Sequence, residues 1–135
     1  MSYQMFTSHM VNSCKKALYD YGEFSKSVDH VLTDMQGEIN EESDKAEQKD
    51  KEAYENIKTI RSELESVHKE LKTSISARNK EKVVEHFTIT LNLLEKLQQE
   101  LKKAVAEGPD EFFFNLEINY FRSTIERIVS KAKSK

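Results

Sequence analysis

Apolar side chains recur every three or four residues along most of the chain, which is the periodicity of an amphipathic α-helix. The first stripe follows a 4-3-4 spacing and is widened by neighbouring apolar positions, so it suits a helix that packs against two others. It predicts a helix over about residues 5–39. The stripe consists of Met10, Cys14, Ala17, Tyr21, Phe24, Val28, Val31 and Met35, widened by Val11, Leu18, Leu32 and Ile39.

This periodicity fails near Gly37 and through the polar segment 40–52, and it resumes about one residue out of register. Either one helix runs through with a discontinuity, or the chain turns between Gly37 and Ser43. We favour the turn, because an unbroken helix of roughly 70 residues would need a partner along its whole length. Ser43 can cap a second helix over about 43–76. Its stripe is Ile57, Ile60, Leu64, Val67, Leu71 and Ile75.

Two further helices are predicted, over about 80–107 and 110–133. Asn79 is a suitable N-cap for the third helix, because its side chain can accept a hydrogen bond from a free backbone N–H. The dipeptide Gly108-Pro109 is the clearest stop signal, since Gly suits the C′ position and Pro cannot continue a helix. The third stripe is Val83, Val84, Phe87, Leu91, Leu94, Leu97, Leu101 and Val105. The fourth is Phe114, Ile118, Phe121, Ile125, Ile128, Val129 and Ala132.

Four helices with short connections predict a single all-α domain over residues 1–135, an antiparallel bundle that begins with a long helical hairpin. Three Gly and one Pro in 135 residues agree, because turns consume these residues. The alternative is an α+β fold, since segments 87–93 and 113–121 also alternate apolar and polar residues as strands do. We favour the all-α fold, because a lone two-stranded sheet is marginally stable.

The charge and the cysteine content narrow the function classes. Charged residues make up 33% of the chain but the net charge is only -3, which argues against a nucleic-acid binder. Cys14 cannot form an internal disulfide, which fits a reducing compartment. The sequence shows no secretory signal and no run of about 18 apolar residues that could cross a membrane. We therefore expect a cytoplasmic protein.

The residues that carry enzyme chemistry are scattered. Glu65 and His68 match once the Glu-x-x-His spacing of di-iron bundles, but that site needs two such pairs, so chance is the better explanation. His86 has Glu85 beside it on a charged face, and Cys14 lies in the apolar stripe as a small buried side chain. No phosphate-binding loop or nucleophile motif is present. We expect no catalytic, cofactor-binding or metal residues, and no cofactor.

The fourth helix is apolar on two sides. Phe112, Leu116 and Tyr120 recur one turn apart on the side away from its core stripe, and Phe113 lies between the two sides. Such a helix needs cover on both sides. One possibility is that the first helix or the N-terminal segment with Tyr3, Met5 and Phe6 folds over it. The other is that Phe112, Phe113, Leu116 and Tyr120 form an interface with a partner.

These patterns favour a non-enzymatic protein-protein interaction module, an adaptor or scaffold, whose partner is another protein or a second copy of the chain. A membrane-surface protein is the alternative, because an aromatic-rich helix leads into a basic C-terminus. Its candidate contacts are Arg127, Lys131, Lys133 and Lys135. A metal-dependent bundle enzyme is a third, weaker hypothesis.

Overall fold

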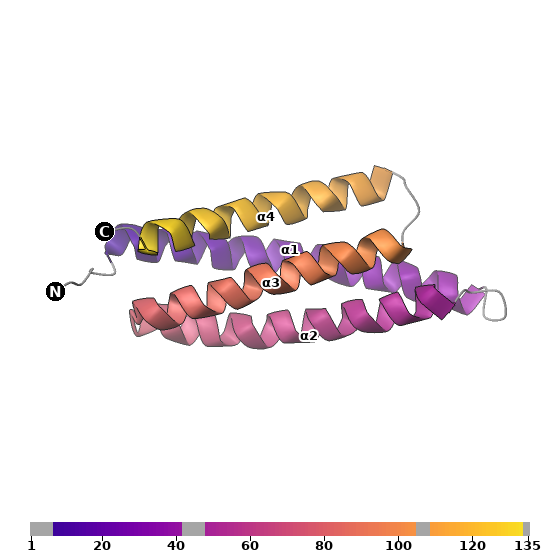
Figure 1. The fold of residues 1–135 in the computed structure, drawn as a ribbon, viewed down its shortest axis with the longest axis horizontal. Coiled ribbons are helices and arrows are strands. Elements are labelled where there is room, and N and C mark those ends of the chain that lie inside the picture. Colours follow the sequence, from indigo (N-terminus) through magenta and orange to yellow (C-terminus); the bar gives the residue numbers. More distant parts are fainter. Residues whose placement is uncertain (1–6, 42–47, 105–108, 134–135) are drawn as a thin grey trace.

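The chain forms four α-helices in the computed structural model, which describes residues 7–41, 48–104 and 109–133 (Figure 1). They are α1 (Ser8–Glu41), α2 (Gln48–Ser76), α3 (Lys80–Ala104) and α4 (Pro109–Lys133). Only the backbone is described at positions 38, 40, 41, 48–50, 103, 104 and 109–114.

No strand occurs in the described part of the chain, so the all-α prediction is confirmed and the α+β alternative is wrong. Segment 87–93 lies inside α3 and segment 113–121 inside α4. Both segments alternate apolar and polar residues, but they also satisfy helical spacing. That spacing buries Phe87 with Thr90 on α3 and Ile118 with Phe121 on α4.

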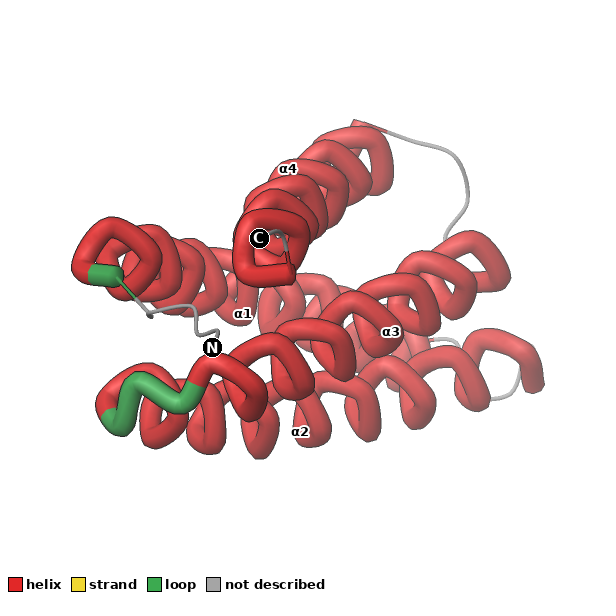
Figure 2. The backbone as a smooth tube through the Cα atoms, turned by 60° about the vertical axis from the view of Figure 1, so that its left-hand side comes forward, coloured by secondary structure: helices red, strands yellow, loops and turns green. Residues whose placement is uncertain are grey.

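The four helices run alternately in opposite directions, as Figures 1 and 2 show from two sides. Each helix packs against its neighbour in the chain, with the most extensive contacts between α2 and α3, and α4 also packs against α1. The described parts of the diagonal pairs, α1 with α3 and α2 with α4, have no backbone contact. The bundle therefore places the first and last helices side by side.

The core consists of the predicted stripes. Nearly all of the stripe positions whose side chains are described are buried or packed against the buried cluster. Those at the centre are fully enclosed, and burial of such a side chain stabilises a fold by about 1.5–3 kcal/mol. The largest of these side chains are Phe87, Ile57, Leu64, Leu94, Leu97, Ile118 and Ile125. Val105 and Phe114, two further predicted core positions, lie outside the described side chains.

The first two helices are separate, and the boundary between them lies a few residues later in the chain than predicted. α1 continues through Gly37 to Glu41, and α2 begins at Gln48. The continuous helix is therefore wrong and the favoured alternative of two separate helices is confirmed, with α1 ending at Glu41 instead of near residue 39. Gly37 has no positive φ and no packed neighbour that a Cβ would meet, so nothing there forces the chain out of the helix. Ser43, the predicted cap, lies outside the described residues.

The turn between α2 and α3 is formed by backbone hydrogen bonds and a side-chain cap. The N–H of Arg78 donates to the carbonyl of Ile75 and that of Asn79 to the carbonyl of Ser74, both at 3.0 Å. This is the Schellman pattern, and it puts Arg78 in the left-handed region at φ 54°. The Oδ1 of Asn79 then accepts a hydrogen bond from the N–H of Lys82 at 3.1 Å. Asn79 is the N-cap of α3, as predicted.

The ends of α1 and α4 follow ordinary helix chemistry. Thr7 caps α1, since its Oγ1 accepts a hydrogen bond from the N–H of Met10 at 3.2 Å. Pro109 is the first residue of α4, where its missing N–H has no partner to lose. Gly108, the other half of the predicted stop signal, lies outside the described residues.

Candidate functional site

The side of α4 that carries the predicted interface is open to solvent where its side chains are described. Leu116 is 49% exposed and Tyr120 55% exposed, whereas Ile118 and Phe121 of the same helix are buried. Phe112 and Phe113 belong to α4, but their side chains are outside the described set, as are Tyr3, Met5 and Phe6. Two of the four predicted interface residues are therefore placed at the surface of the bundle.

The neighbouring helix α1 adds a second exposed aromatic side chain. Tyr19 is 68% exposed, and it stands three residues after Lys16 and four before Glu23, so helical spacing puts it on their side of α1. Of the four large hydrophobic side chains that are exposed in the described part of the chain, Leu116 and Tyr120 belong to α4, Tyr19 to α1 and Ile89 to α3. We call the surface formed by these parts of α1 and α4 the α1–α4 face.

The α1–α4 face contains an acidic hollow of about 400 Å³. Three carboxylates surround it, from Asp20 and Glu23 on α1 and from Glu117 on α4. The rest of its walls consist of Ser27 and four aromatic or apolar side chains: Phe24, Leu116, Tyr120 and Phe121. An apolar floor with charges at the rim is the usual construction of a protein-binding surface.

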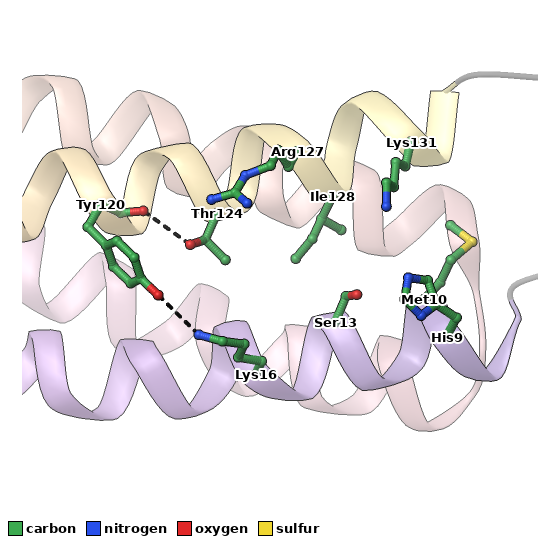
Figure 3. Close-up of a pocket in the computed structure, with 9 residues that line it drawn as sticks. All are labelled: His9, Met10, Ser13, Lys16, Tyr120, Thr124, Arg127, Ile128 and Lys131. Carbon is green, nitrogen blue, oxygen red and sulfur yellow. Dashed lines mark hydrogen bonds between the residues drawn. The ribbon is translucent and has the colours of Figure 1, made fainter.

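A second hollow on the same face, of about 190 Å³, is basic. Figure 3 shows Thr124, Arg127 and Lys131 of α4 across this hollow from α1. The facing residues of α1 are His9, Met10, Ser13 and Lys16. Met10 and Ile128 give the basic hollow an apolar floor.

Tyr120 separates the two hollows and lines both. The ammonium group of Lys16 donates hydrogen bonds to the hydroxyl oxygen of Tyr120 at 3.2 Å and to the carboxylate of Asp20 at 3.1 Å (Figure 3 draws the first). The same ammonium lies 5.6 Å from the centre of the Tyr120 ring. The hydrogen bonds to Tyr120 and Asp20 raise the pKa of Lys16. This bridge fixes the Tyr120 side chain across the seam between the helices.

Several charges on the α1–α4 face are not neutralised within the fold. Arg127 and Lys131 in the basic hollow and Glu117 in the acidic hollow have no hydrogen bond or ion pair with any other described residue. Glu23 has only a long contact with Lys26, 3.9 Å between oxygen and nitrogen, one turn away on the same helix. The face thus presents free positive charge at one end and free negative charge at the other.

A different polar cluster joins α1 to α2 and is satisfied internally. The guanidinium of Arg61 donates to Asp29 at 3.0 Å, to Glu65 at 2.9 Å and to the hydroxyl of Tyr21 at 3.0 Å. Hydrogen bonding to Arg61 lowers the pKa of Glu65, and burial raises the pKa of Tyr21. Because these groups neutralise one another, we interpret the cluster as a connection between helices.

Two of the four histidines, His68 and His86, and the cysteine are packed into the fold. His68 is buried, and that burial lowers its pKa to about 4, assisted by the nearby charge of Lys72. His86 was expected on a charged face, but it is buried beside Ser74, with its Nε2 3.0 Å from a carboxylate oxygen of Glu70. Its position differs because the α2–α3 hairpin covers that side of α3.

Cys14 is buried inside the bundle, and this burial raises the pKa of its thiol to about 11. The thiolate, which is the nucleophilic form of cysteine, is therefore disfavoured there. Glu65 of the Glu-x-x-His match binds Arg61, and no three metal-ligating side chains come together in the described part of the chain.

Comparisons with known protein families, curated proteins and solved structures find no significant match to this chain. None of the described helices has an apolar stretch of the length needed to cross a membrane.

Sequence reasoning missed the contribution of α1 to the face. Lys16, Asp20 and Glu23 follow helical spacing on the polar side of the first stripe, which is the only signal they give. Their proximity to Leu116 and Tyr120 depends on the packing of α1 against α4, about 100 residues apart in the chain.

Proposed function

We propose that this chain is a non-enzymatic protein-interaction module that binds its partner through the α1–α4 face. The observation that carries the proposal is the coincidence of exposed apolar side chains with unneutralised charge: Leu116 and Tyr120 lie beside Glu117, Arg127 and Lys131. Apolar anchors supply affinity when they are covered, and rim charges select the partner and its orientation.

The positions of the basic and acidic hollows along the α1–α4 face indicate what a partner's surface must present. A complementary surface presents an apolar centre over Tyr120, an acidic end over the basic hollow, and a basic end with an apolar contact for Leu116 over the acidic hollow. An amphipathic helix or a pair of helices can present such a surface, because apolar and charged side chains recur along one side of a helix. The proposed partner is therefore a helical protein surface with opposite charges at its two ends.

The acidic hollow argues against the membrane-surface alternative. Arg127 and Lys131 could attract an anionic lipid surface, but Asp20, Glu23 and Glu117 on the same face would be repelled by it. Vesicles that contain phosphatidylserine test this alternative in a flotation assay at low salt. Flotation of the protein with the vesicles, lost in the variant Arg127→Glu/Lys131→Glu, would contradict the proposal.

Site-specific photo-crosslinking in the host cell tests the proposal directly. A benzophenone amino acid placed at Leu116 should give a discrete protein adduct, because this exposed apolar side chain belongs to the α1–α4 face. The matched control is the same amino acid at Ile89 of α3, which is 40% exposed but outside the face. The adduct at Leu116 should disappear when Arg127 and Lys131 are changed to Glu. Equal adducts at the two positions, or none at Leu116, would overturn the proposal.

A further inference from the structure

We infer that the partner of the α1–α4 face is a second copy of this chain, paired antiparallel about a two-fold axis that passes close to Thr124. This inference rests on the proposed function and names its partner. It follows from the way charge is distributed along α4, which makes the face complementary to itself when one copy is turned end to end.

The spacing of α4 carries the argument. Glu117 and Lys131 lie seven residues on either side of Thr124, which places each about 10 Å from it along the helix. Both belong to the side of α4 that lines the hollows, together with Tyr120, Thr124 and Arg127. A two-fold rotation about Thr124 therefore brings Glu117 of each copy opposite Lys131 of the other.

Two apolar residues of α4 are also placed symmetrically about Thr124. Tyr120 and Ile128 lie four residues on either side of Thr124, so the exposed ring of Tyr120 in one copy faces the apolar floor of the basic hollow in the other. The small side chain of Thr124 at the centre lets the two helices approach. An interface in which the same patch serves both copies is the usual form of a homodimer.

The opposite, parallel arrangement is disfavoured by the same charges. It would set Arg127 and Lys131 against their own copies and Glu117 against Glu117, and like charges in direct opposition weaken association. Charge order thus selects the antiparallel dimer.

Two charge-reversed variants test the pairing. Arg127→Glu/Lys131→Glu makes both ends of the face acidic, and Glu23→Lys/Glu117→Lys makes both ends basic. Each alone should bind its own copy at least about tenfold more weakly than the unmodified chain does, because both halves of a two-fold interface become repulsive. An equimolar mixture should restore a dimer, since every contact is again between opposite charges. Light scattering coupled to size-exclusion chromatography measures the mass, and circular dichroism checks that each variant is helical.

A cysteine at the axis tests the register. Thr124→Cys, in a chain that also carries Cys14→Ser, should form a disulfide-linked dimer on mild oxidation, because residues on the axis lie near their own copies. The matched control is Glu126→Cys in the same background, since Glu126 is exposed but lies on the side of α4 that borders α3. Equal rates of cross-linking at the two positions would overturn the inferred register.

The outcomes separate this inference from the proposed function. An unmodified chain that remains monomeric at millimolar concentration, or a mixture that fails to restore the dimer, overturns the inferred self-pairing. If the photo-crosslinked adduct at Leu116 then differs in mass from two copies of the chain, the interaction function stands with a different protein as partner. If no adduct forms, both fail.

Discussion

The imidazole ring of His68 on α2 is stacked on the phenol ring of Tyr21 on α1, with 4.0 Å between the ring centres and 26° between the planes. His68 is buried, and this burial lowers its pKa from 6.5 to about 4. The imidazole is therefore neutral in the folded protein at mildly acidic pH, where an exposed histidine would be charged.

This difference predicts a pH-dependent stability. As the pH falls through 6.5, the unfolded chain takes up a proton at His68 but the folded chain does not, so the free energy of unfolding decreases until the folded protein also titrates near pH 4. The contribution of His68 is a loss of about 2 kcal/mol between pH 7 and pH 5.

The variant His68→Phe isolates this effect. It retains an aromatic ring against Tyr21 and removes the titrating group, and a small cavity of about 10 Å³ lies beside His68. Urea unfolding at pH 7 and pH 5 should show a smaller loss of stability for the variant than for the unmodified protein. An equal loss in both would mean that His68 does not cause it.

A second prediction concerns the ion pair between Arg61 and Asp29, which joins α2 to α1. Asp29 is exposed to solvent, so the coupling should be modest, about 0.5–1 kcal/mol, although the contact is bidentate. A double-mutant cycle with Arg61→Met and Asp29→Asn, read by urea unfolding, measures it. The single variant Arg61→Met should cost more than Asp29→Asn, because it also removes the hydrogen bonds to Tyr21 and Glu65.

The turn between α2 and α3 gives a third prediction, on two adjacent residues. Asn79→Ala should lower the free energy of unfolding by about 1 kcal/mol, because the N-cap of α3 is lost. Asn79→Asp is the matched control, since it keeps an acceptor oxygen and should preserve stability.

Arg78→Gly should raise the melting temperature, because Gly occupies the left-handed region without the strain of a side chain. A lower melting temperature for Arg78→Gly would contradict this reading of the turn.

A fourth prediction concerns Gly22, in the middle of α1. A Cβ there would meet no atom within 4 Å, and φ is not positive, so the helix gains nothing from glycine at this position. Gly22→Ala should stabilise the protein by up to about 1 kcal/mol, the difference in helix propensity. Thermal unfolding followed by circular dichroism measures it, with Gly37→Ala as a second open position on the same helix. Destabilisation by Gly22→Ala would reveal a requirement for glycine that packing does not explain.

The fold was predictable because helical periodicity records which side of each helix is buried. Ile57, Leu94 and Ile125 were expected in the core from spacing alone, and each is fully buried. Asn79 was predicted as an N-cap and is one, because its side chain bonds the backbone N–H of a residue only three positions later. Leu116 and Tyr120 were predicted to lie on the side of the fourth helix away from its core stripe, and both are exposed, but spacing left open whether another part of the chain covers them.

The relations between helices could not be predicted in the same way. Periodicity identifies a polar side of α1 but not the helix that lies beside it, so the bridge from Lys16 to Tyr120 has no sequence signal. His86 looked like a surface residue because acidic residues precede it, but its partners Glu70 and Ser74 come from α2. Such contacts depend on the packing of particular pairs of helices.

The seam between α1 and α4 joins the two ends of the chain, whereas every other described helix contact joins consecutive helices. Contacts between consecutive helices form quickly because they close short loops, so this seam should be the last to assemble and the first to open. Opening it would take apart both hollows at once, since each has walls from both helices. A bound partner would hold the seam shut, and slower hydrogen exchange in α1 and α4 would accompany binding.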